Sequence, residues 1–506
     1  MQKKETLINN RSTSIDISPS EFKKLGYDLV DRIAEVMETI RDKSVTTAES
    51  SEEIRELLNG AASLPEKGEA PAKIIQNAAD LLINHSLYNG HPCFWGYITS
   101  SPAPLGILGD LLASAINPNV GARTLSPMAS EIEAQTVHWI GELINYPENG
   151  GLLVSGGNVA NYIGFIAGIR AKAGLGIRQD GINSLKQELI AYCSAETHTW
   201  IQKAADLYGL GTKNIRWIKT DDNQCMDVSA LENSIKEDLD SGKKPFLVVG
   251  TAGSVSTGAI DPLKNIGQLC QKYNLWFHID GAYGGFAACL PELSDEFSGL
   301  ELADSIAIDP HKWLYSPLEA GCTLVKDPRH LTNAFSYHPP YYNFEQSDLN
   351  YVDYGIQNSR GFKALKVWLS LQQMGRIGYQ QLIREDIALA EGAYQLFLDL
   401  PDFQSFTWNL SICTFRYVPV DLKESLQNDA VKEYLNDLNQ QLLSALENSG
   451  QFFLSNAIIS QNFILRMCIV NFRTIYNDVE ALPVLLRNFG EKLDKEIRPD
   501  WESHIS

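Results

Sequence analysis

The sequence is short of basic residues and has no long apolar run. Lysine and arginine number 42 against 62 aspartate and glutamate, which gives the 506-residue chain a formal net charge of −20. A nucleic-acid-binding protein needs a basic face, and anionic membranes attract basic segments, so this balance argues against both kinds of partner. No run of about 18 apolar residues occurs, so we expect no membrane-spanning helix.

Motifs for metal and nucleotide binding are also missing. The eight cysteines form no C-x-x-C pair, so we expect no thiolate metal site. The absence of a G-x-G-x-x-G or P-loop pattern weakens a nicotinamide or nucleoside-triphosphate interpretation. No apolar stretch of signal-peptide length follows Met1, which favours a reduced cytoplasm. The hydrophobic content of 44% is nevertheless ample for a large core and more than one domain.

The chain divides into three segments by pattern. Residues 1–103 hold amphipathic helical pieces with little core of their own, beginning with Ser18 as an N-cap ahead of Pro19. We expect this segment to pack on a partner subunit. Residues 377–506 combine a long helix, two β-like stretches at 411–417 and 463–471, and a closing helix near 479–497, which indicates a small α+β domain.

Residues 104–376 alternate helical patterns with short apolar runs. This alternation predicts a doubly wound α/β domain whose sheet is mostly parallel and whose ligand binds at the carboxyl ends of the strands. The expected strands are 152–154, 189–193, 215–218, 246–249, 275–279, 306–308 and 322–325.

Two of these strands each deliver one charged residue to their carboxyl end. The first ends at Asp280, and the second leads into Asp309-Pro310-His311-Lys312. A lysine for the aldehyde and an acid for the ring nitrogen are what pyridoxal phosphate requires of a protein. Each residue also has an ordinary interpretation, as a solvated surface lysine and as a helix N-cap. We expect His278 to point to the opposite face of its strand from Asp280, which argues against a metal pair.

Three further strand ends carry polar groups. Gly156 and Gly157 form a strand-to-helix turn whose backbone N–H groups could approach an anion, although many such turns bind nothing. His198 follows the strand at 189–193 and could stack on a flat cofactor, or be an ordinary loop histidine. Thr251 could hydrogen-bond in the same crevice.

Taken together, these motifs resemble the group II pyridoxal-phosphate-dependent decarboxylases, and most of all the aromatic-L-amino-acid decarboxylase branch. The resemblance rests on Ser155-Gly156-Gly157, His198, Asp280-Gly281-Ala282-Tyr283-Gly284-Gly285, Asp309-Pro310-His311-Lys312-Trp313 and the segment 89–97. It implies a fold-type I enzyme of the pyridoxal-phosphate transferase class, homodimeric, with active sites at the subunit interface.

The resemblance also implies roles for individual residues. Lys312 matches the lysine that binds the cofactor aldehyde, and Asp280 matches the acid on the pyridine nitrogen. Ala282 and His198 match the residues on the two sides of the ring. On the phosphate side the matching positions are Gly157, Asn158 and His311. The role of Asp309 stays open, since some relatives carry asparagine there.

A Pro339-Pro340 pair predicts a loop. In the decarboxylases the matching loop closes over the site and its tyrosine protonates the substrate carbon. The register places Tyr341 there, with Tyr342 as a rival. Related aldehyde synthases typically carry phenylalanine at this position, so Tyr341 together with His198 favours decarboxylation.

Four residues are implied on the substrate side. Phe94, Trp95 and Tyr97 resemble the segment that lines the aromatic pocket, with core packing as the alternative. Arg360 matches an arginine that can hold a carboxylate, with an exposed arginine at a helix start as the alternative.

The sequence thus predicts a decarboxylase that uses pyridoxal phosphate on an L-amino acid, with an aromatic side chain as the first choice. Three alternatives remain: a glutamate or 2,4-diaminobutyrate decarboxylase, an enzyme that forms aldehydes or transaminates on the same fold, and a non-catalytic relative acting as a scaffold.

Overall fold

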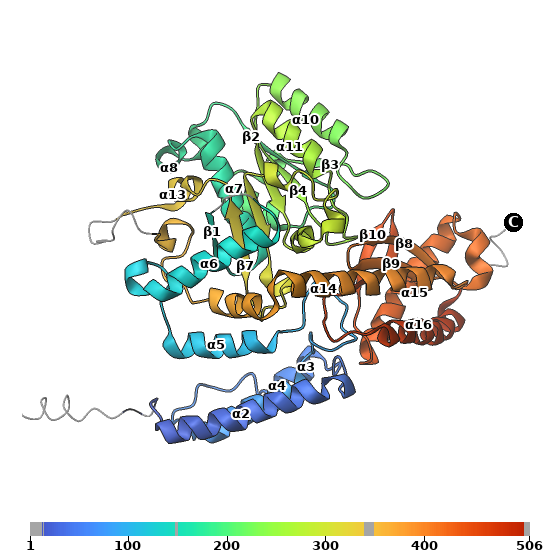
Figure 1. Ribbon diagram of the computed structural model, residues 1–506. Coiled ribbons are helices and arrows are strands. Elements are labelled where there is room, and N and C mark those ends of the chain that lie inside the picture. Colours follow the sequence, from blue (N-terminus) through green and yellow to red (C-terminus); the bar gives the residue numbers. More distant parts are fainter. Residues whose placement is uncertain (1–12, 14, 147–149, 339–348, 500–506) are drawn as a thin grey trace, which may run out of the picture.

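The computed structural model describes residues 13, 15–146, 150–338 and 349–499, which form three parts (Figure 1). A central α/β domain lies between a pair of N-terminal helices below it and a smaller domain to its right. No helix in the described ranges is long and apolar enough to cross a membrane.

The central domain contains a mixed sheet whose described strands follow the order β1-β7-β6-β5-β4-β2-β3. Neighbours from β3 to β6 pair in parallel, whereas β7 is antiparallel to both β6 and β1. The predicted mostly parallel sheet is therefore confirmed. The bounds are β1 Gly150–Val154, β2 Leu189–Ser194, β3 Ile215–Ile218, β4 Lys244–Thr251, β5 Trp276–Asp280, β6 Ser305–Ile308 and β7 Gly321–Val325.

Helices cover both faces of this sheet, and each face has its own core. On one face, α7 packs against strands β4 to β7, and Trp276 belongs to that core. On the other face, α10 and α11 pack against β4, and Phe277 and Ile279 belong to the second core. The helices of this domain are α5 Pro104–Ile116, α6 Pro127–Leu143, α7 Gly157–Ala173, α8 Ile177–Asp180, α9 Trp200–Leu207, α10 Val228–Asp240, α11 Leu263–Tyr273, α12 Pro310–Trp313 and α13 Arg329–Phe335.

The helix α14, Ala364–Asp399, leads from the central domain into the smaller one. It is interrupted at Gly375, which has a positive φ of 58°, two residues before the predicted boundary at 377. The smaller domain has an antiparallel sheet in the order β10-β11-β9-β8, covered by helices. Its elements are β8 Phe403–Asn409, β9 Ile412–Tyr417, α15 Asp429–Asn448, β10 Ser455–Ile459, β11 Asn462–Cys468 and α16 Tyr476–Ile497.

The N-terminal helices contribute little core. Ser18 caps α2, Pro19–Thr39, because its Oγ accepts the N–H of Glu21 at 3.2 Å. No residue of α2 is buried within the chain. The other helices of this segment are α3 Ser51–Leu57 and α4 Pro71–His85, and α4 packs on α2.

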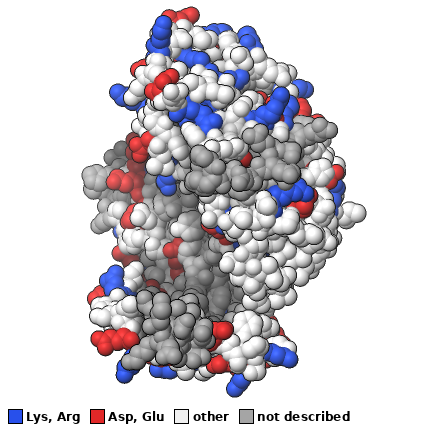
Figure 2. Space-filling model, turned by 90° about the vertical axis from the view of Figure 1, so that its left-hand side faces the viewer, with Lys and Arg blue, Asp and Glu red and all other residues white. Residues whose placement is uncertain are grey.

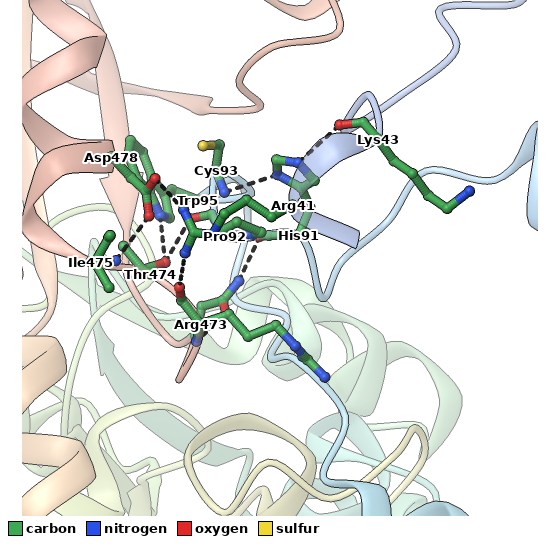
Figure 3. A network of polar contacts seen from close by, with 11 residues as sticks. Arg41, Lys43, His91, Pro92, Cys93, Trp95, Arg473, Thr474, Ile475 and Asp478 are labelled. Atoms are coloured by element: carbon green, nitrogen blue, oxygen red, sulfur yellow. Dashed lines mark hydrogen bonds and ion pairs between the residues drawn. The ribbon is translucent and has the colours of Figure 1, made fainter. Parts of the chain in front are cut away.

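A polar network fastens the N-terminal segment to the smaller domain (Figure 3). Arg41 pairs with Asp478 at 2.6 Å and donates to the carbonyl of Arg473 at 2.7 Å. His91 accepts the N–H of Cys93 on Nδ1, so its Nε2–H donates to the carbonyl of Lys43. The N-terminal segment is therefore held to the start of α16 by the side chain of Arg41.

Candidate active site

One cavity of about 370 Å³ lies at the carboxyl ends of β1, β2, β4, β5 and β6. This is where a doubly wound sheet places its ligands. Its lining residues come from segments far apart in the sequence: Ser155, Gly156, Gly157, Asn158, Asn161, Glu196, His198, Thr251, Gly253, Val255, Asp280, Ala282, Tyr283, Asp309, His311, Lys312, Leu318 and Glu319. Eight sequence-predicted residues thus meet in one cavity: Gly157, Asn158, His198, Thr251, Asp280, Ala282, His311 and Lys312.

Lys312 forms an ion pair at the wall of this cavity. Its Nζ lies 3.2 Å from Oδ2 of Asp309, one helical turn earlier on the chain. The same oxygen is 3.8 Å from Nε2 of His311, while Oδ1 of Asp309 is buried with no hydrogen-bond partner among the described residues. The carboxylate at position 309 therefore does not stand as an isolated negative charge, since the lysine ammonium neutralises it.

Asp280 is buried, and its carboxylate is oriented by two donors. The indole Nε1–H of Trp200 donates to Oδ2 at 2.7 Å, and the N–H of Ala282 donates to Oδ1 at 3.2 Å. Trp200 was not predicted as a site residue, although it follows His198 by only two positions. The arrangement can hold a proton on a basic ring nitrogen.

The two histidines of the cavity are held in defined tautomers. His198 accepts the N–H of Trp200 on Nδ1 at 3.3 Å, and His311 donates from Nδ1 to the carbonyl of Ala320 at 2.7 Å. Desolvation lowers the pKa of each imidazole. Both rings are therefore neutral near pH 7, and neither adds a fixed positive charge.

Thr251 is anchored through its backbone at the end of β4. Its N–H donates to Oδ2 of Asp261 at 2.8 Å, and its hydroxyl is 3.5 Å from that of Thr197. Burial raises the pKa of Asp261 to about 6. The anchor leaves the Thr251 side chain at the cavity wall.

The glycine turn brings the start of α7 close to the cavity floor. A Cβ on Gly157 would lie 2.6 Å from Oδ2 of Asp309 and 3.2 Å from Cβ of Ala282. Gly156 has φ 89°, a conformation that favours glycine. The turn therefore needs glycine at both positions, and it brings Gly157 and Asn158 at the start of α7 to the cavity wall.

The structure places the predicted substrate residues outside this cavity. Phe94 is buried and stacks on Phe453 with ring centroids 5.2 Å apart. Trp95 is fully buried in the core of the smaller domain, where its indole donates to Thr474. Tyr97 is 65% exposed. Within one chain, Phe94 and Trp95 are therefore core residues, which was the alternative stated for this segment.

Arg360 is likewise not at the cavity but in a buried ion pair. Its guanidinium binds both carboxylate oxygens of Glu133 and donates to the carbonyls of Val120 and Leu153. The guanidinium of Arg360 therefore binds groups inside the domain. The alternative stated for this residue, an exposed arginine at a helix start, is also wrong, because Arg360 is buried. Tyr341 and Tyr342 lie outside the described residues.

The expectation for His278 was wrong. Residues two apart on a strand point to the same face, and His278 and Asp280 both contact Trp200, the histidine with ring centroids 5.6 Å apart. His278 is fully buried and does not line the cavity. No cluster of three potential metal-ligating side chains occurs in the described ranges.

Comparisons with known proteins agree with this geometry. The family model described as the pyridoxal-dependent decarboxylase conserved domain matches residues 52–418. The aromatic-L-amino-acid decarboxylase of Bacillus atrophaeus is 30% identical, over 95% of this chain and 98% of that protein. A phenylacetaldehyde synthase of Arabidopsis thaliana is 29% identical, over 89% of this chain and 91% of its own length. The structure of Catharanthus roseus tryptophan decarboxylase in complex with L-tryptophan is 25% identical with a TM-score of 0.84, covering 94% of this chain and 99% of that one. The chain belongs to the pyridoxal-dependent decarboxylase family.

Proposed function

We propose that this pyridoxal-phosphate-dependent carboxy-lyase acts on an aromatic L-amino acid and releases carbon dioxide and the corresponding amine. The observation that carries the proposal is the meeting of Lys312, Asp280 and His198 in one cavity. The match to a curated aromatic-L-amino-acid decarboxylase along almost the whole chain supports the aromatic side chain.

The residues of the cavity fit the cofactor. Lys312 offers an amine to its aldehyde, and Asp280 offers a carboxylate, oriented by two donors, to its ring nitrogen. The start of α7 offers backbone N–H groups to its phosphate, and glycine is needed at position 157 because a Cβ there would collide with the Asp309 carboxylate. When bound, pyridoxal phosphate supplies an electron sink for the bond between Cα and the carboxylate.

Each residue then has a defined task in the proposed reaction. Lys312 would hold the cofactor through its amine, and the Asp280 carboxylate would lie against the ring nitrogen, where an adjacent negative charge favours the protonated form. His198 and Ala282 confine the ring from its two sides. Asn158, His311 and the backbone of Gly157 bind the phosphate end, and Thr251 lies beside the Asp280 strand end. Tyr341 supplies a proton at Cα.

Aldehyde formation is the second candidate, because a phenylacetaldehyde synthase is among the relatives. Tyr341→Phe separates the two outcomes, with Tyr342→Phe as the matched control. We expect the wild type to give amine and carbon dioxide in equal amounts, and Tyr341→Phe to shift the products toward aldehyde, ammonia and hydrogen peroxide, with dioxygen and water consumed. Unchanged products in Tyr341→Phe would contradict the role of this tyrosine.

A non-aromatic substrate is tested by a panel of amino acids assayed for carbon dioxide release. Glu196 and Glu319 line the cavity. Their negative charges would repel the second carboxylate of glutamate and attract a cationic side chain such as that of 2,4-diaminobutyrate. We expect turnover of at least one of phenylalanine, tyrosine and tryptophan to exceed that of both alternatives. A preference for either alternative would overturn the aromatic assignment, and no turnover of any amino acid would favour the scaffold alternative.

We further propose a homodimer. One face of α5 exposes a row of apolar side chains at helical spacing: Leu108 at 52%, Leu111 at 54%, Leu112 at 52% and Ile116 at 70%. The opposite face, with Gly106 and Gly109, packs against α14 and the loop at Pro317. An apolar stripe of this kind favours a protein contact. A second copy there would also lie near α2 and α4, which extend below α5 (Figure 1).

The surface charge is compatible with a small-molecule enzyme. On the face in Figure 2, basic side chains are interspersed with acidic and neutral ones rather than gathered in one stripe. All eight cysteines are free, which supports a cytoplasmic location. Leu111→Asp tests the dimer in sedimentation experiments, with Leu239→Asp on α10, where the leucine is also exposed, as control. We expect only Leu111→Asp to dissociate the dimer, and a wild-type monomer would contradict the proposal.

A further inference from the structure

His278 lies beneath α7, two residues before Asp280 on β5. Its ring is fully buried, and a Cβ on Gly164 of α7 would lie 2.6 Å from it. The helix can therefore approach the ring because a glycine stands at the point of contact. A buried imidazole has a large desolvation cost unless its nitrogens are hydrogen-bonded.

Both ring nitrogens of His278 have partners, and these belong to a chain of hydrogen bonds. The indole N–H of Trp276 donates to Oγ of Ser305 at 2.8 Å, and this oxygen is 2.8 Å from Nδ1 of His278. On the other side, Nε2 of His278 is 2.7 Å from Oδ1 of Asn161. The amide nitrogen of Asn161 donates to the carbonyl of Gly157 at 2.9 Å.

The groups at the two ends of this series of hydrogen bonds fix which atoms donate and which accept. An indole only donates and a carbonyl only accepts. The amide nitrogen of Asn161 therefore faces Gly157, its Oδ1 accepts from His278, and the imidazole hydrogen is on Nε2. Nδ1 is then the acceptor and takes the hydroxyl hydrogen of Ser305. Burial lowers the pKa of His278 to about 4, so the ring stays neutral above that pH.

The chain ends on the part of α7 that faces the cavity. Gly157 is the first residue of the helix, and Asn158 and Asn161 also line the cavity. N–H groups of the first turn of a helix have no intrahelical acceptor. The Gly157 carbonyl and the Asn158 N–H belong to one peptide plane, so a hydrogen bond that fixes the carbonyl also fixes the direction of that donor.

We propose that His278 is a positioning residue which, through Asn161, holds the first turn of α7 in the orientation that binds the phosphate of the cofactor. This inference rests on the proposed function, because it concerns the anion-binding end of the same site. His278 touches neither the cavity nor the reacting atoms; its hydrogen bond selects one orientation of the Asn161 amide.

Two substitutions separate the two nitrogens of the ring. In His278→Gln the side-chain amide reaches the place of Nε2 and can still donate to Asn161, whereas in His278→Asn the shorter amide reaches only the place of Nδ1. The measurements are the dissociation constant of pyridoxal phosphate for cofactor-free protein, the rise in thermal midpoint on adding inorganic phosphate, and kcat at saturating cofactor. Tyr146→Phe, which removes a buried hydroxyl donating to Ala303, is the matched control.

We expect His278→Asn to weaken pyridoxal phosphate binding by roughly fivefold or more, the effect of one lost hydrogen bond, and to reduce the response to inorganic phosphate. His278→Gln should recover most of both losses, and Tyr146→Phe should show neither. Because the change lies in cofactor binding, kcat at saturating cofactor should stay close to that of the wild type.

Equal affinities of His278→Asn and wild type for both anions would overturn the proposal, as would equal losses in the Asn and Gln variants. If His278→Asn does not fold, Ser305→Ala is the substitute, because it removes the hydroxyl that donates to Nδ1. It should weaken the binding of both pyridoxal phosphate and inorganic phosphate, and unchanged affinities in this variant would also overturn the proposal. A wild type that binds inorganic phosphate but no pyridoxal phosphate would instead contradict the proposed function.

Discussion

Arg360→Met distinguishes a structural arginine from a substrate-binding one. The arginine contributes two hydrogen bonds to Glu133 and one each to the carbonyls of Val120 and Leu153, and its side chain is 4% exposed. Glu133 is fully buried, and without Arg360 its carboxylate retains the N–H of Leu153 at 2.9 Å. The substitution therefore leaves a buried negative charge without its countercharge.

The expected loss is about 3–5 kcal/mol of unfolding free energy, the usual cost of removing one partner of a buried ion pair. For a domain of this size it corresponds to a fall of roughly 5–9 °C in the thermal midpoint. The assay is thermal unfolding at a fixed scan rate together with KM for the best substrate. Glu133→Gln combined with Arg360→Met should recover part of the loss, because the uncompensated charge is gone.

The opposite pattern would refute this reasoning. If Arg360→Met raised KM strongly while the thermal midpoint stayed within a degree or so of that of the wild type, the guanidinium would be binding substrate rather than holding β1 to α6. The double variant is decisive, since a substrate-binding arginine gives no recovery of stability when Glu133 is neutralised.

Two further predictions concern buried polar groups. Trp200→Phe removes the indole donor to Asp280, so we expect the affinity for pyridoxal phosphate to fall roughly tenfold or more, the usual effect of losing a hydrogen bond to a charged group. The control is Trp408→Phe, because the indole of Trp408 donates to the carbonyl of Leu410 in the smaller domain, and this variant should bind the cofactor as the wild type does. Equal affinities of wild type and Trp200→Phe would contradict the role of Trp200. Asp386 accepts from Trp313 and Tyr315, and burial raises its pKa from 3.8 to about 7. The folded state therefore retains a proton that the unfolded state loses between about pH 4 and 7, and the stability contributed by this group falls as pH rises through that window. The thermal midpoint of Asp386→Asn should decline less from pH 5 to pH 8 than that of the wild type, and equal declines would contradict the assignment.

The sequence was sufficient to predict the residues whose position follows from strand order. Asp280 and Lys312 each end or follow an apolar run, and the carboxyl ends of β5 and β6 meet at the same edge because these strands are parallel neighbours. The glycine turn before α7 follows from the same rule. The order and direction of the strands therefore account for the cavity residues that lie at strand ends.

Residues whose role depends on packing between elements could not be predicted in this way. Trp200, at the start of α9, donates to Asp280 at the end of β5, 80 residues later, a contact that no local pattern encodes. Trp95 lies in the core of the smaller domain because the chain before it is fastened to the start of α16, more than 370 residues later. For His278 the period of two was itself sufficient, and the expectation applied it wrongly.

The same limit holds for the smaller domain. Two of its strands and its closing helix were predicted, whereas β8, β10 and α15 were not. In β10 buried and exposed positions alternate, but the exposed positions hold the apolar Ile458 as well as the polar Asn456, so the residue types give little signal of this alternation. These strands are defined by pairing with β11 and β9, which only the fold supplies.

The central claim is tested most directly by comparing wild type with Lys312→Ala. Each cofactor-free protein is titrated with pyridoxal phosphate and then assayed for carbon dioxide release from phenylalanine, tyrosine and tryptophan. The wild type should develop the visible absorbance of a lysine-bound cofactor and release carbon dioxide, whereas Lys312→Ala should lose both while unfolding at a similar temperature. A Lys312→Ala protein that kept that absorbance and the wild-type rate would contradict the account.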